Sequence, residues 1–145
     1  MNWHYEGKEF VLDEHPDDII GFVYIITNTQ NNMKYIGKKL VRTTRKLPPL
    51  KGKKRRRTKI VETDWRDYYG SSDNVKQTLA ESGPDIFTRE ILILCKSKGE
   101  LSYLEAKEQF DRGVLLKPDE YYNGIIQLRI NRRAVLNSDI INNTI

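Results

Sequence analysis

Short apolar runs separated by a polar turn occupy the chain from residue 21 to residue 37. "FVYIIT" follows Gly21 and consists mainly of β-branched and aromatic residues, which favour strands. "NTQNN" is typical of a turn, and "MKYIG" resumes an extended run. The pattern therefore predicts a β-hairpin over residues 21–37.

A short helix is predicted between this hairpin and a later apolar run. Ser71, Ser72 or Asp73 can cap its beginning, and Gly83-Pro84 ends it. The run "IFTREILILC" follows, and its length and branched apolar residues favour a central strand.

A second helix and an extended segment complete the pattern. Ser97 and Glu100 have the spacing of a capping box, which predicts a helix from Ser97 to Gly113. "DEYYNGIIQLRI" then predicts a last strand or an extended segment. This order of elements favours an α+β fold, in which helices flank a small mixed or antiparallel sheet of three strands.

The length of 145 residues suits one domain. Residues 1–20 contain six acids and one lysine, and we expect an acidic arm ahead of the domain. The domain itself is expected over residues 21–130, and residues 131–145 form a polar tail rich in asparagine.

Charge is distributed very unevenly. Residues 38–59 hold 12 of the 25 Lys and Arg residues and none of the 20 acids. Such a block repels itself unless a polyanion supplies countercharge, so nucleic acid is the leading partner. Pro48, Pro49 and Gly52 lie within it, and no apolar periodicity is sustained. We expect a long basic insertion loop that becomes ordered on its partner.

The sequence shows no sign of a membrane or secretory segment. No run approaches the ~18 consecutive apolar residues of a spanning helix, and the first residues lack the apolar block of a secretory signal. The single cysteine, Cys95, ends an apolar run and is expected to be a buried thiol. We therefore expect a cytoplasmic protein without a membrane partner.

Two glycine-and-tyrosine elements lie on the predicted hairpin. The first is "GFVY", one residue longer than the usual three, in which Tyr24 takes the tyrosine position. The second is "KYIG", which contains Tyr35 and Gly37. Together with the basic segment, a late helical glutamate and an asparagine, they resemble the GIY-YIG nuclease family, in particular its compact, free-standing phage members. The resemblance implies an endonuclease that hydrolyses DNA with Mg²⁺ or Mn²⁺, in phage homing or degradation of host DNA.

The resemblance also implies a role for each tyrosine. Tyr24 would be the general base, and Tyr35 would position the phosphate or the water. A free phenol titrates near ~10, so it takes a proton at neutral pH only if a nearby cation lowers its pKa. Lys38 and Lys39 follow the second element closely enough to supply that cation.

The family carries a phosphate-binding arginine after its second element. Arg45, eight residues after Gly37, stands at a similar spacing, while Arg42, the arginines of residues 55–57 and Lys39 are alternatives. Other basic side chains would contact backbone phosphates. The DNA contacts expected in this way are Lys38, Arg42, Lys53, Lys54, Arg55, Arg56, Arg57 and Ser71, although Ser71 can equally cap a helix.

The metal ligand is expected on the second helix. Glu105 shares a helical stripe with Leu101 and Leu104, so its charge lies beside residues that favour the core. The resemblance implies that a glutamate on such a helix holds one divalent ion, with Glu108 as the alternative to Glu105. Asn123, in "YYNG", resembles the late asparagine of the family, which helps to fix the site near the phosphate.

Two other classes of function remain open from the sequence. A non-catalytic nucleic-acid-binding protein would use the basic segment alone and bind in a salt-sensitive manner without metal. A structural or assembly factor would dock on other proteins. The sequence also leaves open whether the chain acts as a monomer or as a dimer on DNA.

Overall fold

The structure is a computed structural model and describes residues 2–136, 138 and 140. The strands are β1 (Trp3–Tyr5), β2 (Lys8–Glu9), β3 (Gly21–Asn28), β4 (Lys34–Leu40), β5 (Arg42–Leu47), β6 (Arg57–Glu62) and β7 (Phe87–Cys95). The helices are α1 (Asp73–Ser82), α2 (Lys98–Asp111) and α3 (Arg132–Leu136), with 3-10 turns η1 (Leu12–Glu14), η2 (Trp65–Asp67), η3 (Pro84–Ile86) and η4 (Val114–Leu116).

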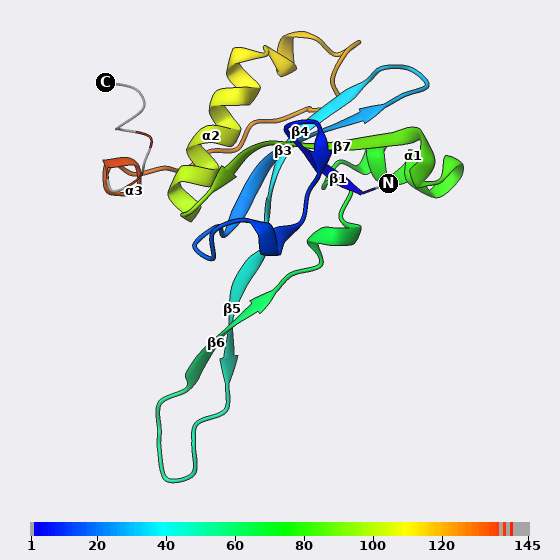
Figure 1. Cartoon of the computed structure of the whole chain (residues 1–145). Coiled ribbons are helices and arrows are strands. Elements are labelled where there is room, and N and C mark those ends of the chain that lie inside the picture. Colours follow the sequence, from blue (N-terminus) through cyan, green and yellow to red (C-terminus); the bar gives the residue numbers. More distant parts are fainter. Residues whose placement is uncertain (1, 137, 139, 141–145) are drawn as a thin grey trace.

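One mixed sheet of five strands forms the centre of the molecule, in the order β2-β1-β7-β3-β4 (Figure 1). Strand β3 is antiparallel to both β7 and β4, and β1 adds to the other side of β7 in parallel. The α+β class is confirmed, and so is the hairpin of β3 and β4. The sheet has two more strands than the three expected, because β1 and β2 come from the N-terminal residues.

The first twenty residues differ from the expected acidic arm. They add strands to the sheet, and their apolar side chains Trp3, Phe10, Leu12 and Ile19 are buried. The acids are exposed. The elements in this segment are too short to show a clear alternation of apolar and polar residues. Because acids dominate this segment, the sequence pattern did not indicate that four of its residues belong to the core.

Both faces of strand β3 are covered. Phe22, Tyr24 and Ile26 face one core cluster, whereas Val23 and Ile25 face a second cluster that includes residues of α2. This explains why β3 reads as an uninterrupted apolar run. Tyr24 lies on the first of these two faces.

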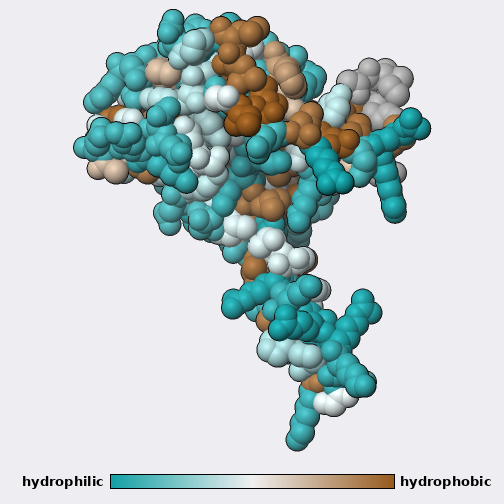
Figure 2. Space-filling model, turned by 180° about the vertical axis from the view of Figure 1, so that it is seen from behind, coloured by the Kyte–Doolittle hydropathy of each residue, from teal (hydrophilic) through white to brown (hydrophobic). Residues whose placement is uncertain are grey.

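The basic segment is a second correction. It is not a long loop, because β4 continues to Leu40 and β5 pairs with β6 in an antiparallel two-stranded sheet. Figure 1 shows this hairpin projecting from the body of the molecule, and Figure 2 shows that the surface of the projection is mostly hydrophilic. Thr43, Thr44, Ile60 and Val61 are β-branched and support the strands, while the prolines follow β5 and restrict irregular structure to residues 48–56.

The predicted helices are confirmed with their caps. Ser72 accepts a hydrogen bond from the Val75 backbone and begins α1, and Ser97 accepts one from Glu100 and begins α2. Turns and η4 follow α2, and in the predicted last segment, residues 119–130, an isolated bridge joins Tyr121 to Lys34 and no strand forms. Of the predicted polar tail, α3 is described, and residues 137, 139 and 141–145 lie outside the described residues.

Candidate active site

The Tyr24 ring crosses the edge strand of the sheet. Tyr24 lies opposite Gly37 in the β3-β4 register, and a Cβ added to Gly37 would lie 2.6 Å from Cζ of the Tyr24 ring. Only a residue without a side chain leaves room for the ring there. Gly21 has a similar function, because a Cβ on it would lie 2.6 Å from the Lys39 carbonyl oxygen and 3.0 Å from Leu101 of α2. The glycines of both elements therefore permit close packing.

Tyr35 lies beside Tyr24 on the same face of the sheet, with their ring centroids 6.3 Å apart. The Tyr35 hydroxyl and the Ser71 hydroxyl share a hydrogen bond of 2.8 Å. Gly70 precedes this serine with a φ of +93° and packs against both tyrosine rings. The expected pair of tyrosines is thus brought together, and the residue that precedes the α1 cap joins it.

Tyr68 is a third tyrosine at this place, and the sequence did not single it out for the site. Its ring lies edge-on to that of Tyr24, with the centroids 6.0 Å apart, and Tyr68 raises the pKa of Tyr24. The Lys39 ammonium lies 4.2 Å from the centroid of the Tyr68 ring and donates a 2.6 Å hydrogen bond to Asp64. A lysine and three phenols therefore form one connected group.

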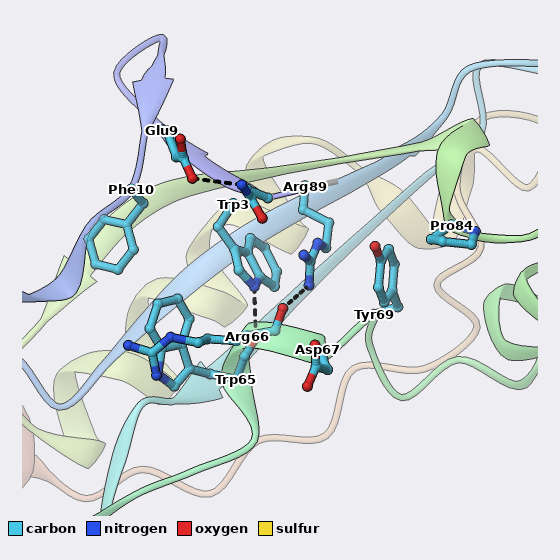
Figure 3. A pocket seen from close by; sticks show the side chains of 10 residues that line it. Trp3, Glu9, Phe10, Trp65, Arg66, Asp67, Tyr69, Pro84 and Arg89 are labelled. Carbon is cyan, nitrogen blue, oxygen red and sulfur yellow. Dashed lines mark hydrogen bonds between the residues drawn. The ribbon is translucent and has the colours of Figure 1, made fainter.

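A layer of hydrogen bonds supports the segment that carries Tyr68. Arg89 of β7 donates to the backbone carbonyls of Arg66 and Tyr68, and the Trp3 indole donates to the Trp65 carbonyl. Figure 3 shows Trp3, Trp65, Arg66 and Arg89 around a hollow of about 490 Å³, which neither Tyr24 nor Tyr35 lines. Arg89 and Trp3 donate hydrogen bonds to backbone carbonyls beside this hollow, so we interpret them as supports of the segment that carries Tyr68.

Burial controls the titration of the tyrosines. Burial raises the pKa of Tyr24 well above its usual value, and neighbouring Tyr68 and Tyr35 raise it further. Burial also raises the pKa of Tyr35, which the hydrogen bond with Ser71 partly offsets. Both phenols are therefore neutral in the free protein at neutral pH, and Tyr24 can act as a base only when added positive charge stabilises its phenolate.

Glu105 approaches the same edge of the sheet from α2. Its carboxylate lies 3.9 Å from the Lys38 ammonium, which itself donates to Ser102. Burial raises the pKa of Glu105, and Lys38 opposes that rise. The carboxylate also raises the pKa of Tyr24, so the two groups interact electrostatically. Glu108 differs, because it forms an ion pair with Arg112 at 3.0 Å.

The donor set is sparse for a metal. Within the part of the chain that the structure describes, no group of three His, Cys, Asp or Glu side chains is placed to hold an ion. Glu105 is largely buried, and its carboxylate makes a long ion pair of 3.9 Å with the Lys38 ammonium. Mg²⁺ accepts such a site, because it commonly binds one or two carboxylates and completes its shell with water and substrate oxygens.

Asn123 is buried and completes the edge of β4. Its side-chain oxygen accepts from the Ile36 backbone N–H at 3.0 Å, and its side-chain nitrogen donates to the Ile36 carbonyl at 2.8 Å. The amide therefore pairs with Ile36 as a neighbouring strand would. Gln109 of α2 donates to the same carbonyl. Asn123 fixes the strand on which Tyr35 and Gly37 lie.

Several predicted basic residues lie away from this group. Arg45 is exposed on β5, opposite Lys59 in the projecting hairpin, so the structure does not bring it to the tyrosines (Figure 1). Arg42 donates to the carbonyls of Asp17 and Ile19 and anchors the root of the hairpin. Lys53, Lys54, Arg55, Arg56 and Arg57 are exposed at or near its tip.

The five-stranded sheet, with two tyrosine elements on β3 and β4 and a glutamate on the covering helix, defines a nuclease domain of the GIY-YIG class. The chain belongs to the family described as "Putative endonuclease segE, GIY-YIG domain", which matches residues 3–126. A comparison with curated proteins and one with solved structures found no significant match.

The family match confirms the resemblance seen in the sequence. It supports nuclease activity in general, with DNA as the substrate of such a domain. The match starts at residue 3, where β1 begins, and therefore includes the N-terminal residues that join the sheet. Among the described residues, no helix has both the length and the apolar character needed to cross a membrane.

Proposed function

We propose that this chain is a divalent-metal-dependent endonuclease that hydrolyses phosphodiester bonds of duplex DNA. The observation that carries the proposal is that Tyr24 and Glu105 approach the same edge strand, β4. Tyr24 reaches that strand over Gly37, and Glu105 of α2 lies 3.9 Å from the ammonium of Lys38, the next residue of the strand. A base and a metal-binding carboxylate beside adjacent residues of one strand suit a phosphate bound there.

In the proposed mechanism, Tyr24 takes a proton from the attacking water. The phenolate that this requires would be stabilised by nearby positive charge, from the bound metal ion and from Lys39, whose ammonium lies 4.2 Å from the centroid of the neighbouring Tyr68 ring. Tyr35, held by Ser71, orients the phosphate. A Mg²⁺ or Mn²⁺ ion bound by Glu105 would polarise the phosphate and stabilise the leaving oxygen.

The phosphate-binding cation in this proposal is Lys39 rather than Arg45. The Lys39 side chain is mostly buried beside Tyr68, with an exposed fraction of 18%, whereas Arg45 is exposed on the hairpin. Asp64 holds the ammonium in the free protein. Asn123 contributes by keeping β4 in place through Ile36.

The projecting hairpin supplies affinity for duplex DNA in this proposal. Arg45 and Lys59 lie directly opposite each other, and like charges in that position destabilise a strand pair. An isolated two-stranded hairpin is only marginally stable in water, so phosphates that neutralise the cations would stabilise it. A two-stranded ribbon also fits the major groove of B-DNA.

The biological setting that we propose with this activity is the cytoplasm, as a bacteriophage-type homing or DNA-degrading enzyme. It is supported only by the resemblance of the compact chain to such nucleases. Whether the enzyme nicks or cuts both strands follows from its oligomeric state on DNA.

Cleavage of supercoiled plasmid with and without Mg²⁺ tests the proposal. Tyr24→Phe and Glu105→Gln are expected to abolish nicking and linearisation while DNA binding persists. Tyr5→Phe, on β1 beyond β7, and Glu108→Gln, in the Arg112 ion pair, are the matched controls and are expected to cleave as the unmodified chain does.

The other outcomes would contradict the proposal in different ways. Metal-independent cleavage would exclude the role of Glu105 as a metal ligand. Salt-sensitive binding to a range of duplexes without cleavage under any metal condition would favour a non-catalytic DNA-binding protein.

A further inference from the structure

A cleft beside the proposed active site has no assigned role. It has a volume of about 440 Å³ and lies where the edge of β4, the root of the hairpin and the first turns of α2 meet. Lys38, Leu40, Thr43, Lys98 and Ser102 are among the residues that line it. The cleft therefore borders both the strand that carries the proposed active site and the root of the projecting hairpin.

The charged side chains that line the cleft are all lysines. Lys38 and Lys98 contribute ammonium groups, and Lys39 borders the cleft while its ammonium is bound to Asp64. Lys38 donates to the Ser102 hydroxyl and is only loosely paired with Glu105. Among the described residues, Lys98 has no ion pair and is exposed. The cleft therefore carries positive charge that the protein itself does not neutralise.

The position of Lys98 on its helix points to an anion. Lys98 is the first residue of α2, after the Ser97 cap. A cation at a helix N-terminus is unfavourable, because the unpaired N–H groups there already carry positive partial charge. A bound phosphate would be attracted by both the ammonium and the helix end, so a lysine that is unfavourable for the helix alone becomes favourable with a ligand.

The geometry of α2 aligns this cleft with the proposed catalytic carboxylate. Lys98, Ser102 and Glu105 are separated by four and three residues, so they lie on one face of the helix. Seven residues of helix span about 10.5 Å, and successive phosphates of one DNA strand are about 3.4 Å apart along the duplex axis. A strand whose scissile phosphate lies near Glu105 can therefore place a phosphate about three positions away beside Lys98 in the cleft.

None of the residues that line the cleft is acidic. Asp17 and Asp18 line an adjoining pocket, to which Lys98 and Thr43 of the cleft also contribute, and Asp18 pairs with Lys96 at 3.4 Å. Glu105 itself belongs to the proposed metal site. The described surface of the cleft is thus suited to an anion and not to a second metal ion.

We propose that the cleft formed by Lys38, Lys98 and Ser102 binds a backbone phosphate of the DNA strand about three positions from the scissile phosphate. This inference rests on the proposed function, because it names how the same substrate continues from the active site towards the hairpin. The contact is to phosphate and carries no base preference. It would hold the strand in register on α2 while the hairpin occupies the groove.

The salt dependence of duplex binding, measured in EDTA so that the DNA stays intact, tests the proposal. Loss of one phosphate contact is expected to reduce the slope of log Kobs against log salt by about 0.9. Lys98→Ala should show this reduction, and Lys98→Arg, which keeps the charge, should retain the original slope. Lys107→Ala is the matched control, because Lys107 is exposed on the same helix, outside the cleft, and pairs with Asp111 at 2.7 Å.

Thermal melting separates binding from folding in these variants. Lys98→Ala is expected to melt at or above the temperature of the unmodified chain, since it removes a cation from the helix N-terminus. An unchanged slope for Lys98→Ala, or equal reductions for Lys98→Ala and Lys107→Ala, would overturn the proposal. Because binding is read without cleavage, a chain that never cuts DNA but shows the Lys98 effect would refute the proposed function and leave the phosphate contact at Lys98 standing.

Discussion

Gly37→Ala tests whether Tyr24 must cross β4 above a residue without a side chain. The new Cβ would lie 2.6 Å from Cζ of Tyr24 and still closer to its hydroxyl, whereas ordinary contacts begin near 3.4 Å. The overlap with the ring is therefore about 0.8 Å. Tyr24 is only 1% exposed, so its ring cannot swing into solvent, and either β4 or the ring must shift by a comparable distance.

The expected cost has two parts. Overpacking of a buried site costs about 1–3 kcal/mol, and alanine regains about 0.5–1 kcal/mol that glycine loses within a strand. A net loss of about 1–2 kcal/mol would lower Tm by about 3–6 °C in a domain of this size. Displacement of a catalytic group by about 1 Å can reduce the rate roughly 100-fold, so activity should fall more than stability.

Melting and plasmid cleavage, measured on the same preparations, check this prediction. Gly124→Ala is the control, because a Cβ there meets nothing within 4 Å. The stability cost of Gly37→Ala should also be smaller in a Tyr24→Phe background, which removes the nearest atom. Normal melting and normal cleavage by Gly37→Ala would refute the reasoning, since the ring would then have room that the structure denies it.

Four further predictions concern other parts of the chain. Asn123→Ala should cost about 1–3 kcal/mol in chemical denaturation, because the buried Ile36 N–H loses its partner. Burial raises the pKa of Glu105 in the folded state, so the folded protein loses stability as the pH rises and the carboxyl group ionises. Without metal, Glu105→Gln should therefore melt higher than the unmodified chain at pH 8, and the difference should shrink towards pH 4. Replacement of residues 46–58 by Asn-Gly should leave the domain folded by circular dichroism but reduce the salt slope of duplex binding by several units. Burial raises the pKa of Cys95 to about 12, so a thiol reagent at pH 8 should label it only after denaturation.

Local patterns were sufficient for most of the elements. The hairpin of β3 and β4, the caps at Ser72 and Ser97 and the central strand β7 each depend on neighbours in the sequence, and each was predicted from them. The strands β1, β2, β5 and β6 were not. Their segments are dominated by charge, and their pairing depends on partners that sequence patterns do not identify.

The candidate site divides in the same way. Tyr24, Tyr35, Glu105 and Asn123 were found from motifs, because a motif records which residue types recur at set positions. The site also includes Tyr68, for which the signal was only an aromatic pair before the glycine and serines of "YYGSS". Asp64 and the support from Arg89 had no signal in the sequence.

By itself, the sequence determined the family, the two tyrosine elements and the concentration of positive charge between residues 38 and 59. Those features are local, because spacing along the chain fixes which residues share a strand, a helix face or a segment. The tertiary structure decided which basic residue accompanies the tyrosines: Lys39 lies on their face of β4, while Arg45 is carried away on the hairpin. It also decided why the glycines are needed, since the closeness of Tyr24 to Gly37 exists only once β3 and β4 pair in register.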